Sequence, residues 1–178
     1  SGAEILLSIN GSPFELDKGE ARVDLAVARV VETGLPFVFL NQICGQDELV
    51  FDGASFVLNA DRTLAVKAPA FAEALVLTQW TRGADGWVCA PQPPAPPLPR
   101  EAQIYAAMML GLRDYVAKNR FPGVVLGLSG GIDSALSAAV AADALGPERV
   151  RAVMLPSPYT SAESLEDAAA CARLLGIR

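Results

Sequence analysis

The sequence contains no histidine and only three cysteines, which lie far apart and form no Cys-x-x-Cys pair. A structural zinc site needs a cluster of such ligands, and a disulfide framework needs an even number of cysteines, so neither is indicated. We expect Cys44, Cys89 and Cys171 to stay reduced, as in the cytoplasm.

Long apolar runs and an excess of positive charge are also missing. The longest runs, Leu35–Leu40 and Val124–Leu128, are far shorter than the roughly 20 residues that cross a bilayer, so we expect no membrane anchor. Fourteen Lys and Arg residues against twenty Asp and Glu give a net charge of −6, which argues against a nucleic-acid-binding protein. The 52% of hydrophobic residues suffices for a packed core.

Nearly half of the thirteen prolines fall within residues 91–100. Proline fixes φ and removes a backbone donor, so this stretch favours an extended conformation and predicts a linker or surface strap. A proline-rich ligand for a recognition module is the alternative. The prediction divides the 178 residues into a domain at 1–90 and a second at 101–178.

The first ninety residues predict short strands around one helix, an α+β layer on an open sheet. Hydrophobic periodicity and turn residues place the helix at Gly19–Thr33. The predicted strands are a buried strand Ile5–Ile9, then Pro36–Leu40, Leu49–Phe51, Ala54–Leu58, Leu64–Lys67 and Ala74–Trp80.

After the prolines, helices and strands alternate, which predicts a parallel, right-handed βαβ unit of the α/β class. Because Arg178 comes where a third strand is due, and because Ser1 opens directly into a strand-like run, we expect an internal piece of a longer protein without a signal peptide. The predicted elements are helices Glu101–Asn119, Asp133–Leu145 and Ser164–Leu175, and strands Val124–Leu128 and Val150–Leu155.

The eight residues from Gly127 to Ser134 stand between an apolar strand and an alanine-rich helix. Paired glycines let successive N–H groups point at an anion, and the helix N-terminus strengthens such a phosphate site. A carboxylate at Asp133 beside phosphates implies a bridging Mg²⁺. The segment lacks the lysine of a Walker A loop and the GxGxxG spacing. The alternative is a tight turn in which Asp133 caps the helix.

The string resembles the SGGxDS signature of the PP-loop ATP pyrophosphatases, which split ATP into AMP and pyrophosphate while adenylating an acceptor. The resemblance implies that Ser129 is catalytic over the pyrophosphate and that Asp133 binds the metal. It also implies a set of residues that hold the ATP phosphates, namely Gly127, Leu128, Ser129, Gly130, Gly131, Ile132, Asp133 and Ser134.

The stretch Met154–Ser161, followed by Ser164–Ala168, is similar to the segment of NAD synthetases that lines the adenosine pocket. This similarity adds Leu155 and Ser157 to the expected ATP-binding residues. The alternative for Ser164 is a helix cap.

The first part of the chain resembles a nitrilase-type glutaminase domain, through Asn10–Phe14, Lys18, Arg22, Asn41-Gln42 and Gln46–Phe56. A nitrilase-like segment ahead of a PP-loop is similar to the glutamine-dependent NAD synthetases. The resemblance implies the C-terminal half of a nitrilase-like α+β sandwich, followed by the start of a PP-loop adenine nucleotide α-hydrolase-like parallel α/β domain.

By the same resemblance, Ser12 and Lys18 contact glutamine. A lysine suits the α-carboxylate of that ligand, although Lys18 could equally be a solvated residue at the helix start. The family's catalytic cysteine lies in a Cys-Glu-Asp motif that this chain does not contain. Cys44 has no histidine to activate it, so we expect no glutaminase nucleophile here.

The resemblance therefore implies a carbon–nitrogen ligase. It uses ATP and Mg²⁺ to amidate nicotinic acid adenine dinucleotide (deamido-NAD) to NAD through an adenylated intermediate, with ammonia from glutamine. The alternatives are a non-catalytic nucleotide-binding or assembly fragment, or another PP-loop amidotransferase. The expected partners are ATP, glutamine, deamido-NAD and further copies of the chain in a cytoplasmic homo-oligomer, with no nucleic acid and no membrane.

Overall fold

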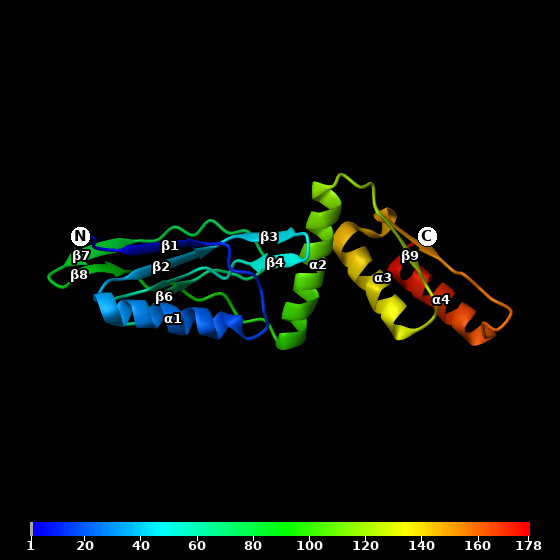
Figure 1. The fold of residues 1–178 in the computed structure, drawn as a ribbon, viewed down its shortest axis with the longest axis horizontal. Helices are drawn as coiled ribbons and strands as arrows, with labels where there is room; N and C mark the ends of the chain where they lie inside the picture. Colours follow the sequence, from blue (N-terminus) through cyan, green and yellow to red (C-terminus); the bar gives the residue numbers. More distant parts are fainter. Residues whose placement is uncertain (1) are drawn as a thin grey trace. The chain divides into compact units, whose positions relative to one another are not determined.

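The computed structural model describes residues 2–178, which form two compact units of mixed α/β structure (Figure 1). Unit 1 comprises the chain up to Cys44 together with Leu49–Ala107, and unit 2 comprises Gly45–Glu48 together with Met108–Arg178. Among the described residues, no helix is both long and apolar enough to cross a membrane.

Unit 1 is built on a four-stranded sheet in the order β1, β2, β5, β6. Helix α1 links the parallel strands β1 and β2 and ends at Gly34 in the left-handed conformation, whereas β5 and β6 are antiparallel to their neighbours. Figure 1 shows α1 along one side of this sheet. The bounds are β1 Leu6–Asn10, α1 Lys18–Thr33, β2 Phe37–Asn41, β5 Phe56–Leu58 and β6 Leu64–Lys67.

The apolar stripe of α1 packs on this sheet and forms the first core. Ala26 and Val30 lie against aromatic side chains of β2 and β5, where Phe39 and Phe56 stack with ring centroids 4.9 Å apart. Strand β1 is only half-buried: Leu7 is 73% exposed, so the prediction of a buried strand holds for only one face of it. Alternation along β1 turns every second side chain away from α1, and no described residue covers that face enough to bury it.

Two hairpins accompany the sheet, and one of them corrects a predicted strand. Residues 74–79 form no regular structure, so the strand predicted at Ala74–Trp80 was wrong: Leu75 and Leu77 are almost fully exposed and find no partner strand. The pairing starts at Trp80 instead. The strands of the hairpins are β3 Ile43–Gln46 with β4 Leu49–Asp52, and β7 Trp80–Gly83 with β8 Gly86–Cys89.

The proline-rich stretch runs as a strap along β6. The amide of Gln92 donates to the carbonyl of Ala65 (2.8 Å), and the amide of Ala95 donates to the carbonyl of Lys67 (3.1 Å). The few residues there that retain an N–H therefore anchor a segment whose prolines cannot donate.

Unit 2 contains the expected βαβ unit, with β9 and β10 parallel and α3 between them. Its core joins Val116 of α2 and Leu128 to the alanine-rich face of α3. The carbonyl of Arg178 accepts from the amide of Ala152 (2.6 Å), which places the end of the chain beside β10. The bounds are α2 Arg100–Lys118, β9 Val124–Gly127, α3 Ile132–Leu145, a 3-10 turn Pro147–Arg149, β10 Val150–Val153 and α4 Ala162–Leu175.

A close glycine contact holds residues 45–48 against α2 within unit 2. The amide of Gly45 donates to the carboxylate of Asp114 (2.8 Å), and the ammonium of Lys118 donates to the carbonyl of Gly45 (2.5 Å). A Cβ at Gly45 would lie 2.8 Å from the Cα of Gly111, so only glycine fits there.

Gly45→Ala should lower the free energy of unfolding by about 1–3 kcal/mol, because the added methyl collides with helix backbone that cannot rotate away. Urea unfolding followed by circular dichroism measures this. Gly19→Ala is the control, since a Cβ there meets nothing within 4 Å and alanine favours the helix. Equal stability of the two variants would contradict the contact.

Cys89 should resist alkylation in the folded protein, because burial raises the pKa of its thiol above the ordinary 9.0 and leaves no access to the sulfur. Iodoacetamide at pH 8 should label half-buried Cys171 first, and Cys89 only in urea, as measured by mass spectrometry of the peptides. Equal labelling of the two thiols in the folded state would refute this prediction.

The unfolded chain releases the Cys89 proton at lower pH than the folded chain, so the free energy of unfolding should fall as the pH rises past 9.0.

Candidate functional site

The loop between β9 and α3 is fixed by one glycine. Gly130 has φ +85°, a conformation that L side chains rarely adopt, and its Cβ position lies 2.3 Å from the carbonyl oxygen of Ser164. The first turn of α4 therefore presses directly on the loop. Glycine is required here both for the dihedral angle and for the contact.

Two serine hydroxyls close the loop on itself. The Oγ of Ser134 accepts from the amide of Ser129 (3.1 Å) and donates to the carbonyl of Gly131 (2.9 Å). The Oγ of Ser129 accepts from the amide of Gly131 (3.3 Å) and lies 3.1 Å from the Oγ of Ser134. Because the Ser134 proton is already used, Ser129 donates in that last contact.

The start of α3 leaves backbone donors free of side-chain caps. Its N-cap is Gly131, in extended conformation and with no side-chain cap, while Asp133 lies within the first turn. The alternative in which Asp133 caps the helix is therefore wrong. Uncapped N–H groups at a helix N-terminus form an anion site.

Helix α4 begins earlier than the Ser164 cap alternative requires. Its N-cap is Ser161, whose Oγ accepts from the amide of Ser164 (3.1 Å) and donates to the Oγ of Ser164 (2.9 Å). Ser164 is thus a residue of the first turn, and its hydroxyl accepts from that of Ser161.

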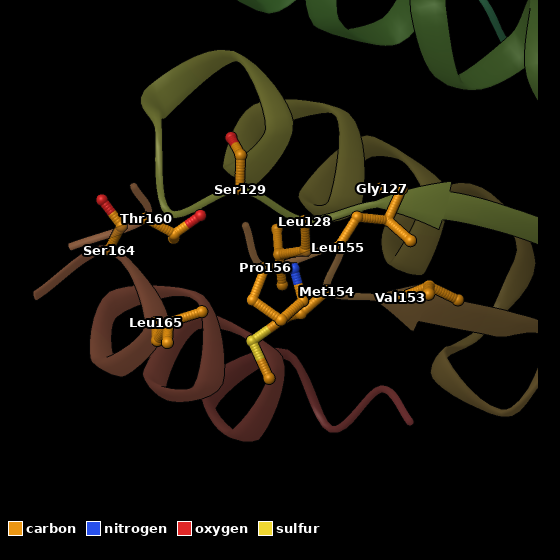
Figure 2. Close-up of a pocket in the computed structure, with 10 residues that line it drawn as sticks. All are labelled: Gly127, Leu128, Ser129, Val153, Met154, Leu155, Pro156, Thr160, Ser164 and Leu165. Carbon is orange, nitrogen blue, oxygen red and sulfur yellow. The ribbon is translucent and has the colours of Figure 1, made fainter. Parts of the chain in front are cut away.

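A pocket of about 310 Å³ opens where β9 and β10 end beside α4. The carboxyl ends of parallel strands are where ligands bind in open α/β sheets. Figure 2 shows that the lining comes from both strand ends and from the start of α4. The lining residues are Gly127, Leu128, Ser129, Val153, Met154, Leu155, Pro156, Thr160, Ser164 and Leu165.

Four of the predicted ATP-binding residues line this pocket: Gly127, Leu128, Ser129 and Leu155. The remaining loop residues, 130–134, lie next to it along the chain, and Ser157 is not among its lining residues. The Oγ of Ser157 instead accepts from the amide of Tyr159 (3.2 Å), within a turn that Thr160 closes.

Thr160 and Leu165 line the pocket without having been predicted to bind ATP. Leu165 follows a helix start that the sequence misplaced. Thr160 lies in a stretch that the sequence did identify, directly after β10. Closer attention to hydroxyls just beyond a strand end could have found it.

The acidic residues that the structure describes form no preformed metal centre. Among residues 2–178, no group of three or more His, Cys, Asp or Glu could hold a metal ion. Asp133 is a single exposed carboxylate beside the loop. Mg²⁺ is commonly held in this way, by one or two carboxylates together with substrate phosphates and water.

The two residues predicted to contact glutamine lie in different surroundings in unit 1. The ammonium of Lys18 pairs with the exposed carboxylate of Glu15 at 2.6 Å, and this hydrogen bond lowers the pKa of Glu15. The Oγ of Ser12 accepts from Nε of the buried Arg22 (3.0 Å). Lys18 therefore has a surface partner, whereas Ser12 is held from the protein interior.

Gly130→Ala should lower the midpoint of thermal unfolding more than Gly131→Ala. A left-handed alanine costs about 1–2 kcal/mol, and its methyl group also meets the Ser164 carbonyl. At Gly131 a Cβ meets only the Oγ of Ser129, at an ordinary 3.5 Å. Differential scanning calorimetry compares the two variants, and equal midpoints would show that the loop does not pack on α4 as described.

Comparison with known proteins shows which proteins the chain resembles. The NAD synthase family matches residues 104–178. The chain is 54% identical over 178 residues to a glutamine-dependent NAD(+) synthetase of Rhodobacter capsulatus and 44% identical over 174 residues to one of Acinetobacter baylyi. These matches cover 100% and 98% of this chain but only 32% of each relative.

A solved structure agrees with these matches. The glutamine-dependent NAD+ synthetase of Acinetobacter baumannii, in complex with adenosine diphosphate, matches with a TM-score of 0.90 and 44% identity. The match covers 98% of this chain and 33% of that one. Over essentially its whole length, the chain is similar to glutamine-dependent NAD(+) synthetases, of which it spans about one third, and its residues 104–178 match the NAD synthase family model.

Proposed function

We propose that this chain is part of an enzyme that amidates deamido-NAD to NAD, a carbon–nitrogen ligase driven by ATP with glutamine as the source of ammonia. The single observation that carries the proposal is the glycine loop at the joint end of β9 and β10, within the segment that the NAD synthase family matches. The similarity to a synthetase solved in complex with adenosine diphosphate supports nucleotide binding by the enzyme.

In this proposal, residues 101–178 begin a PP-loop domain and bind ATP at the described pocket. The amides and hydroxyls of Gly127–Ser134 receive the phosphates, and the apolar side chains at the end of β10 receive the adenosine, Leu155 among them. A pocket of about 310 Å³ lies at the lower end of the usual range for small-molecule sites.

The reaction needs a carboxylate to be turned into a better acyl donor. Adenylation achieves this: the nicotinate carboxylate attacks the α-phosphate of ATP and pyrophosphate leaves, after which ammonia displaces AMP. Backbone donors of the loop, with Ser129, stabilise the negative charge that grows on the departing pyrophosphate. Asp133 would hold Mg²⁺, which supplies further neutralisation of the phosphate charge when bound.

For the ammonia source, we propose that residues 1–90 are part of a nitrilase-like glutaminase domain joined by the strap at 91–100. Ser12 and Lys18 would contact glutamine there. The Lys18–Glu15 pair is exposed, and such pairs contribute little free energy, so the α-carboxylate of a ligand can replace Glu15 as the partner of Lys18.

Asp133→Asn in a full-length synthetase that contains this chain should reduce ATP–pyrophosphate exchange by about a hundredfold or more, because the neutral amide no longer holds the cation against the phosphates. Exchange of radiolabelled pyrophosphate into ATP, measured with deamido-NAD present, tests this. Glu166→Gln, which removes an exposed carboxylate of α4, is the matched control.

The same assay separates catalysis from mere binding. A wild-type protein that binds ATP but shows no exchange would support a non-catalytic nucleotide-binding module and would overturn the proposed function. Unchanged melting temperatures for both variants ensure that the comparison reports chemistry rather than folding.

A further inference from the structure

Arg22 is a buried arginine whose five N–H donors are all used. Both oxygens of the Asp52 carboxylate accept from Nη1, at 2.8 and 2.9 Å. Nη2 donates to the carbonyls of Ser12 (2.8 Å) and Pro13 (2.9 Å), and Nε donates to the Oγ of Ser12 (3.0 Å). The guanidinium therefore has no donor left for a ligand.

Asn41 holds Ser12 from a second strand. Its Oδ1 accepts from the amide of Ser12 (2.9 Å), and its Nδ2 donates to the carbonyl of Ser12 (3.0 Å). Both backbone groups of Ser12 and its hydroxyl oxygen are thus held by residues of α1 and β2, and Asp52 of β4 in turn holds Arg22.

The direction of the Arg22–Ser12 bond determines what Ser12 can recognise. Arginine cannot accept, so Ser12 is the acceptor in this contact and retains its own hydroxyl proton for another partner. A hydroxyl whose oxygen is held in this way can donate its proton to an oxygen of a ligand.

We infer that Arg22 is a positioning residue for glutamine binding: it holds Ser12 so that the serine hydroxyl donates to an oxygen of glutamine. This inference rests on the proposed function, because it takes glutamine as the ligand at Ser12. Arg22 acts only through Ser12 and its loop and does not touch the ligand.

Arg22→Lys tests the inference in a full-length synthetase that contains this chain. A lysine ammonium keeps the positive charge beside Asp52 but, as a single point donor, cannot also form the planar set of bonds to Ser12 and Pro13. The KM for glutamine should rise at least tenfold, whereas NAD formation supported by added ammonium chloride should stay within twofold of the wild type. Arg29→Lys, which changes an exposed arginine of the same helix, is the control.

A double-mutant cycle distinguishes action through Ser12 from a separate effect. Ser12→Ala alone should also raise the glutamine KM, and adding Arg22→Lys to it should raise the KM by clearly less than the product of the two single effects. Multiplicative effects would overturn the inference, as would an unchanged KM in Arg22→Lys.

Two further outcomes are decisive. If Arg22→Lys lowers the glutamine-supported and ammonia-supported rates together, Arg22 is only structural and the inference is wrong. If the wild type forms NAD from ammonia but not from glutamine, the glutamine half of the proposed function fails and the inference fails with it. A wild type that uses glutamine while Arg22→Lys keeps its KM overturns the inference alone.

Discussion

The parallel pairing of β9 and β10 is the constraint on which the candidate site depends. The register pairs Val124 with Val150 and Gly127 with Val153, so both strands end at the same level. Beyond that level the backbone has no sheet partner and must satisfy its polar groups locally. The two segments that leave the sheet therefore become the loop and the pocket wall, side by side.

The two serine-containing sites are organised by different physics. At the phosphate loop the hydroxyls of Ser129 and Ser134 are exposed and bond to each other and to loop amides, so a ligand with phosphate oxygens can compete for the same donors. Around Ser12 the partners are the buried ion pair of Arg22 and Asp52. Buried pairs of this kind do not adapt cheaply, because separating them leaves a charge without solvent. The first site can rearrange around a ligand, and the second presents a fixed donor.

Glycine acts at two places through contact rather than through flexibility. Gly45 allows residues 45–48 to approach the α2 backbone at Gly111, and Gly130 allows the loop to approach the α4 backbone at Ser164. In both cases a methyl group would stand under 3 Å from backbone atoms. These contacts join segments that are distant in sequence, and no local pattern around either glycine reveals its partner.

Strong periodicity and a distinctive loop let the sequence by itself determine the βαβ unit, the helix α1 and the position of the loop at a helix start, because these follow from local hydrophobic spacing and glycine placement. The strand predicted at Ala74–Trp80 was wrong, because its β-prone residues have no partner strand. The alternative that made Asp133 the helix cap was also wrong, because the N-cap is Gly131, two residues earlier. Only the tertiary structure decided that Gly130 packs on Ser164, that Thr160 and Leu165 share the pocket, and that Arg22 reaches Ser12 and Asp52. The residues of these pairs lie ten to more than thirty positions apart in the sequence. The pairs depend on which strands and helices meet in space, and the local sequence around each residue does not encode this.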